Sequence, residues 1–89
     1  MLSGVKAMKL WIDDKQSAPS GYTWCRRIED AKDIIGRCLM FGLMDIEVID
    51  ICKEFGKGTE CADFIRWMQE MRYNAKELRI HSIHKEGAE

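Results

Sequence analysis

Four short runs of strand-forming residues, separated by two stretches with helical spacing, constrain the fold of this chain more than any other feature. The strand-like runs cover residues 8–12, 22–26, 46–51 and 77–83, and the helix-like stretches cover residues 28–40 and 60–72. The predicted order of elements is therefore β-β-α-β-α-β. Strands joined by helical crossovers lie parallel in one sheet, with right-handed connections.

Both helix-like stretches place apolar residues on one face. In the first these are Ile28, Ala31, Ile34, Ile35, Cys38 and Leu39, and in the second they are Cys61, Phe64, Ile65, Met68 and Met71. Acidic residues occupy the first turn of the first stretch, and Gly42 is placed to end it. Thr59 is placed to cap the second stretch.

The connection between the first two strands contains no helix. Its residues 15–21, "KQSAPSG", have the composition of a loop. A parallel crossover usually needs a dozen or more residues. The second strand is therefore either parallel and reached by an extended loop, or antiparallel, and the sequence leaves both open.

The size and composition of the chain suit one small domain. Its 89 residues are 46% hydrophobic and 33% charged, with a net charge of -1, which gives no sign of nucleic-acid or anionic-membrane binding. We expect a single domain over residues 8–84, an N-terminal extension over 1–7 and a polar tail over 85–89. No apolar run approaches the roughly 20 residues of a membrane span. Since the first residues also lack the apolar segment of a signal peptide, we expect a cytoplasmic protein.

The four cysteines are Cys25, Cys38, Cys52 and Cys61. An even number allows disulfides, but the sequence shows no secretion signal and no Cys-x-x-Cys spacing. Cys38 and Cys61 fall on the apolar faces of the predicted helices. We expect free thiols that pack as small hydrophobic groups, with a disulfide or metal role as the alternative.

Polar side chains follow three of the predicted strands at their carboxyl ends. They are Asp13 and Asp14 after the first strand, Asp50 near the end of the third, and His81 and Ser82 at the end of the fourth. Ligands bind at this edge of an open parallel sheet. Clustered carboxylates repel one another and call for a cation, and oxygen ligands select Mg²⁺ or Mn²⁺. A bound phosphate would then contact His81 and Ser82. The alternative is that each residue is a turn, cap or structural residue.

Several motifs follow one another in a recognisable order. They are "LWIDD", "SAPSG", "YTWCRR", "IEDA", Asp50 at the end of a strand, "FGKGTE", "FIRWM" and "IHSIH". Their order and spacing over residues 8 to about 87 resemble the cyclic-phosphate processing receiver-domain family, a branch of the response-regulator receiver superfamily.

This resemblance implies a fold, a ligand class and roles for residues. The fold would be a small receiver- or flavodoxin-like α/β domain, with a four-stranded, mostly parallel sheet of order 2-1-3-4 and two main helices. The ligand would be a cyclic phosphate or cyclic nucleotide. Asp13, Asp14 and Asp50 would bind Mg²⁺ or Mn²⁺, and Asp50, His81 and Ser82 would be the catalytic residues.

The sequence also departs from the family pattern. The family usually has Asp-His-Asp-Leu where this chain reads Asp50-Ile51-Cys52-Lys53, and the residues His84-Lys85 replace an Asn-Pro pair. Two functions therefore remain open. The first is a metal-dependent cyclic phosphoesterase, and the second is a catalytically inactive receiver-like module that binds a ligand or a protein.

One face of the predicted sheet carries no helix. With the strand order 2-1-3-4, right-handed crossovers place both helices on the same face. The other face carries Lys9, Trp11, Tyr22 and Trp24, and parallel sheets are normally covered on both faces. We expect the loop 15–21 and the N-terminal residues to cover part of it, and a second copy or a protein partner to cover the rest. The alternative is a two-layer domain that folds alone.

Overall fold

The sheet contains four strands in the order β2-β1-β3-β4, and each neighbouring pair is parallel. The strands are β1 (Lys6–Ile12), β2 (Thr23–Cys25), β3 (Met44–Cys52) and β4 (Glu77–His81), and the helices are α1 (Ile28–Phe41) and α2 (Glu60–Glu70). This computed structural model describes residues 6–42 and 44–82. The predicted fold class and strand order are confirmed, and β2 runs parallel to β1.

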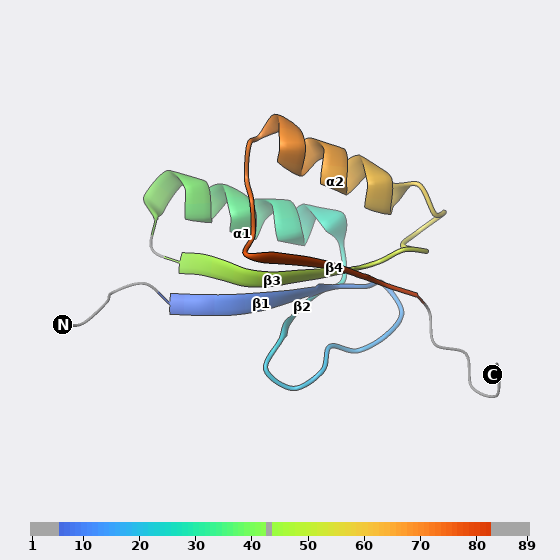
Figure 1. Cartoon of the computed structure of the whole chain (residues 1–89). Coiled ribbons are helices and arrows are strands. Elements are labelled where there is room, and N and C mark those ends of the chain that lie inside the picture. The colour runs from blue at the N-terminus through green and yellow to red at the C-terminus, as the bar shows by residue number, and fades with distance from the viewer. Residues whose placement is uncertain (1–5, 43, 83–89) are drawn as a thin grey trace.

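Both helices lie on one face of the sheet, as predicted, and the connection from β1 to β2 lies on the other (Figure 1). Two tryptophan side chains fasten this connection. The indole N–H of Trp11 donates to the Gln16 carbonyl at 3.0 Å, and that of Trp24 donates to the Asp13 carbonyl at 2.8 Å. The loop can therefore return the chain to a parallel strand without a helix. A partner over the remaining open surface stays a prediction, and residues 1–5 lie outside the described part.

The hydrophobic core lies between the sheet and the helices. Its fully buried side chains include Leu10, Ile12, Ile35, Ile46, Ile49, Ile51 and Phe64. A shift in register lets β3 supply three of these. Met8 pairs with Ile46 but Lys9 pairs with Val48, so that Glu47 is an extra residue in the strand. This bulge keeps Ile46 in the core with Ile49 and Ile51, and leaves Val48 and Asp50 on the opposite face.

The ends of the elements agree with the predictions to within about two residues. Gly42 ends α1 with a φ of 66°, and its N–H donates to the Cys38 carbonyl at 2.9 Å. Thr59 precedes α2, but its hydroxyl makes no capping hydrogen bond. The Glu60 carboxylate instead accepts the Lys57 N–H at 3.0 Å. The predicted end of the fourth strand at residue 83, His84 and the tail 85–89 lie outside the described residues.

The described part of the chain includes no helix that is long and apolar enough to cross a membrane.

All four cysteines are free thiols, and all are buried, as expected. Burial raises the pKa of Cys25 and of Cys52 to about 11. A folded-state pKa above the ordinary value means that the folded protein binds the thiol proton more tightly than the unfolded chain does.

We predict that the free energy of unfolding falls as the pH rises above about 9. The contribution of Cys25 is complete below its ordinary pKa of 9.0 and is lost as the pH rises toward about 11. Each pH unit in that window costs up to about 1 kcal/mol per thiol. Urea unfolding at several alkaline pH values measures this slope, and Cys25→Ala should flatten it. An identical slope in the variant would contradict the assignment.

Candidate functional site

The register of three parallel strands brings the candidate site together. Ile12 of β1 is level with Ile51 of β3, which is level with Ile80 of β4. The next residues along these strands are Asp13, Cys52 and His81, and Cys52 pairs directly with His81. Because side chains alternate along a strand, the row formed by Asp13, Cys52 and His81 faces away from the helices.

The His81 imidazole lies between two carboxylates. Its Nδ1 is 2.6 Å from Asp50 Oδ1, and its Nε2 is 2.8 Å from Asp13 Oδ2. The Trp11 ring stacks on it with centroids 3.9 Å apart and an interplanar angle of 10°. Asp13 is 0% exposed and Asp50 7% exposed, while the His81 side chain is 16% exposed. The ring is therefore fixed through both nitrogens and one face.

The two short contacts can both be hydrogen bonds only for certain arrangements of protons on the three side chains. A neutral imidazole donates from one nitrogen, whereas an imidazolium donates from both. Both contacts are hydrogen bonds if an imidazolium lies between two carboxylates. They are also hydrogen bonds if a neutral imidazole lies between one carboxylate and one protonated carboxyl group. The group can hold a proton at either side of the His81 ring.

Asp13 is anchored as a charged group despite its burial. Burial by itself would raise its pKa, but hydrogen bonds from the backbone N–H groups of Gln16 and Lys15, and from His81, outweigh burial and lower the pKa. The two N–H groups donate to Oδ1 at 3.0 Å and 2.8 Å. The Oδ1 atom of Asp13 thus stabilises the turn after β1, while its Oδ2 atom contacts His81.

Asp14 faces a different part of the structure. Its Oδ2 accepts the Gly56 N–H and contacts Lys15 Nζ, both at 3.2 Å, while its Oδ1 is buried with no hydrogen-bond partner among the described residues. Gly56 has a φ of 60°, and a Cβ there would lie 2.6 Å from a carboxylate oxygen of Glu60. The left-handed backbone therefore favours glycine at this turn beside Asp14, while the Glu60 carboxylate, at the end of a flexible side chain, could move to admit a Cβ.

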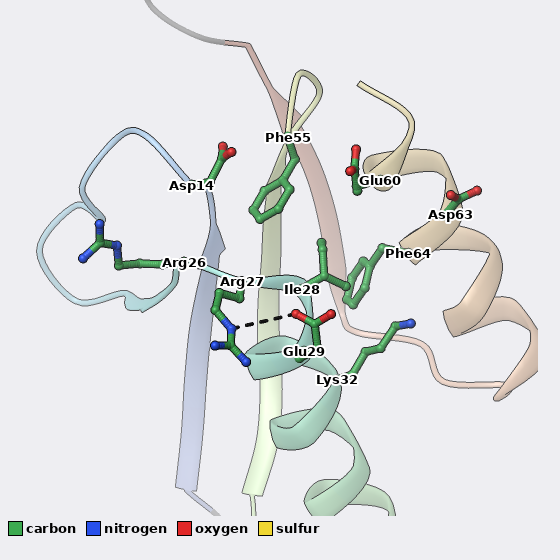
Figure 2. A pocket seen from close by; sticks show the side chains of 10 residues that line it. All are labelled: Asp14, Arg26, Arg27, Ile28, Glu29, Lys32, Phe55, Glu60, Asp63 and Phe64. Atoms are coloured by element: carbon green, nitrogen blue, oxygen red, sulfur yellow. Dashed lines mark ion pairs between the residues drawn. The ribbon is translucent and has the colours of Figure 1, made fainter. Parts of the chain in front are cut away.

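A groove of about 510 Å³ opens beside Asp14, between the first turns of α1 and α2 (Figure 2). On the α1 side the groove is lined by Arg26, Lys32 and the ion pair of Arg27 with Glu29, and on the α2 side by the acidic residues Glu60 and Asp63. Phe55 and Phe64 line it with aromatic surface. The lining includes Asp14 but neither Asp13 nor His81. The groove is therefore distinct from the hydrogen-bonded group of His81, and the consecutive residues Asp13 and Asp14 link the two.

The predicted site residues thus fall into three places. Asp13, Asp50 and His81 meet in one hydrogen-bonded group, Asp14 borders the groove, and Ser82 is exposed just after β4. The roles of all five stay predictions. Cys52 was not among the predicted site residues, and a metal role for the cysteines was only the alternative, although Cys52 lies two residues after Asp50 and so shares its face of the strand.

Three different donor atoms converge at this site. One ligand atom each from Asp13, Cys52 and His81 lies within 4.8 Å of the other two, so the group could hold a metal ion. This set of oxygen, sulfur and nitrogen differs from the all-oxygen set expected for Mg²⁺ or Mn²⁺. The choice of Mg²⁺ or Mn²⁺ stays a prediction.

Comparison with known proteins gives one match. A family model described as "Cyclic-phosphate processing Receiver domain" matches residues 8–89. The chain belongs to the cyclic-phosphate processing receiver domain family. The resemblance seen in its motifs is thereby confirmed. No curated protein and no solved structure matches the chain significantly.

We predict that His81→Ala lowers the free energy of unfolding by about 3 kcal/mol, because two buried carboxylates lose their shared partner. Combining His81→Ala with Asp13→Asn should cost clearly less than the sum of the two, by about 1 kcal/mol or more. Urea unfolding measures both effects. Asp33→Asn is the control, since Asp33 forms an exposed pair with Arg37 and should change stability by less than about 0.5 kcal/mol. Equal costs for His81→Ala and the control would refute the buried pairing.

Proposed function

We propose that this receiver-like domain binds a cyclic phosphate ester at the carboxyl edge of its sheet and opens the phosphate ring by hydrolysis. The observation that carries the proposal is the position of His81 between Asp13 and Asp50. A histidine held in this way is suited to proton transfer, and the family to which the chain belongs is described by the processing of cyclic phosphates.

The reaction requires two proton movements. A water oxygen bonds to phosphorus, one ring P–O bond breaks, and the product is a phosphate monoester with a free hydroxyl group. One proton leaves the water and one reaches the departing oxygen. The group of His81 and its two carboxylates can accept the first proton and donate the second, a role typically worth about 10²–10⁴-fold in rate.

The groove beside Asp14 suits the organic part of such a ligand. Its volume of about 510 Å³ falls within the range of small-molecule sites. The aromatic side chains of Phe55 and Phe64 offer apolar contact, and Arg26 and Lys32 offer positive charge to a phosphate. A ligand of mononucleotide size could therefore lie in the groove with its phosphate near the Asp13–Asp14 turn.

A second candidate function is binding without turnover. Both ring nitrogens of His81 are already engaged by carboxylates, and Cys52 occupies a position where the family usually has an acid. A domain with these features could retain the ligand class and lack the reaction.

The proposal predicts turnover of at least one compound in a panel of cyclic nucleotides and an oligonucleotide with a cyclic phosphate end. Phosphorus NMR of the full chain, with Mg²⁺, Mn²⁺ or Zn²⁺ added separately, detects the monoester product. His81→Gln should lower kcat by about 10²–10⁴-fold. Lys32→Gln should raise KM, because the groove would lose a positive charge that attracts the phosphate of the ligand.

Asp33→Asn, on the exposed surface of α1, is the matched control and should keep the wild-type rate. Wild-type turnover by His81→Gln would refute the proposed role of the site. Binding seen by calorimetry without any product would identify the second candidate function. Neither binding nor product would exclude both.

A further inference from the structure

We propose that Asp13, Cys52 and His81 form a binding site for a cation of the Zn²⁺ class, and that Asp50 positions the His81 ring for it. The inference concerns the same edge of the sheet as the proposed function, but it follows from side-chain geometry and does not require that hydrolysis occurs. Its starting observation is the convergence of an oxygen, a sulfur and a nitrogen donor within 4.8 Å of one another.

Cys52 lies on the strand between its two partners. Neighbouring strands are about 4.8 Å apart, so Asp13, directly after β1, and His81 on β4 are separated by the full width of β3. Their side chains nevertheless meet, with Nε2 and Oδ2 2.8 Å apart. Cys52 pairs with His81 in the sheet and is 0% exposed. The sulfur therefore lies close to the two side chains that meet over its strand, and it donates to Glu54 Oε1 at 3.7 Å, a contact that a bound cation would replace.

Small movements would convert this arrangement into a zinc site. Bonds of about 2.0–2.3 Å in a tetrahedral site place its donor atoms about 3.3–3.6 Å apart. The Nε2–Oδ2 pair would open by about 0.5 Å as the cation replaces the shared proton. The longest separation in the group, at most 4.8 Å, would close by about 1.2 Å. Side-chain rotation alone can supply shifts of this size.

Asp50 completes the arrangement as a positioning residue. Histidines that bind metals usually donate their other ring N–H to a carboxylate. The 2.6 Å contact between His81 Nδ1 and Asp50 Oδ1 has this form and leaves Nε2 for the cation. The stacked Trp11 ring holds the plane of the imidazole.

The donor atoms favour Zn²⁺ over Mg²⁺. Thiolate and imidazole ligands suit Zn²⁺, whereas Mg²⁺ is bound through oxygen and retains several waters. The carboxylate of Asp13 and the thiolate of Cys52 would balance the two positive charges of the ion. This balance limits the cost of burying it.

Three protein ligands leave a fourth position, which in zinc enzymes is taken by water or substrate. Of the three, His81 is the one with solvent exposure, at 16% of its side chain. The fourth position would therefore open on the side of His81.

Titration of the chelator-treated full chain with Co²⁺, a coloured substitute for Zn²⁺, tests this site. We expect one equivalent to bind and to produce a near-ultraviolet absorption band from thiolate-to-cobalt charge transfer. Zn²⁺ should remove the band, and excess Mg²⁺ should leave it. Cys52→Ser should abolish the band, whereas Cys61→Ser, a buried thiol on α2, should keep it. Asp50→Asn should keep the band and weaken the affinity by about 10–100-fold.

The wild-type spectrum decides the question even if Cys52→Ser does not fold. Absence of bound Co²⁺, binding without the thiolate band, or a band that survives in folded Cys52→Ser would each overturn the inference. These readings need no substrate. A band without turnover of any cyclic phosphate would support the metal site and refute hydrolysis. Turnover in the presence of chelator, with no band on adding Co²⁺, would support hydrolysis and refute the metal site.

Discussion

The in-register pairing of β1, β3 and β4 is the constraint on which the candidate site depends. Parallel strands that end at the same level bring their last residues into one row, and here that row consists of Asp13, Cys52 and His81. A slip of one residue in either pairing would turn a member of the row to the other face of the sheet. Ile12 and Ile51, which precede the row on β1 and β3, hold the register of these two strands because they fill the core on the opposite face.

Burial and charge are balanced around His81 by a small number of contacts. Two carboxylates that are nearly inaccessible to water would repel each other, but the imidazole lies between them and bonds to both. The backbone N–H groups of Lys15 and Gln16 hold the second oxygen of Asp13. The same contacts that stabilise this edge also leave a group that can hold a proton or, with Cys52, a cation. Stability and proposed chemistry therefore depend on the same side chains.

Sequence reasoning recovered the parts of the fold that follow from periodicity. Alternating strands and amphipathic helices gave the element order, and the crossover rule placed both helices on one face. The direction of β2 could not be predicted, because the loop before it is fastened by indole hydrogen bonds from Trp11 to Gln16 and from Trp24 to Asp13, which the residue pattern does not show. The bulge at Glu47 was equally inaccessible, since only packing decides that Ile46 joins Ile49 in the core.

The candidate site was predictable in outline. Because the carboxyl ends of parallel strands lie at one edge of the sheet, Asp13, Asp50 and His81 could be expected to lie close together. The same argument could not distinguish Asp13 from Asp14, whose side chain instead accepts the Gly56 N–H. Cys52 was not predicted as a site residue, because a buried thiol in a strand is also typical of a hydrophobic core.

A crystal structure of the full chain tests the arrangement of His81 between its two carboxylates most directly. We predict that His81 reaches across β3 to Asp13 through a hydrogen bond or a shared cation, with Asp50 on the other ring nitrogen. A His81 ring turned away from both acids would contradict it.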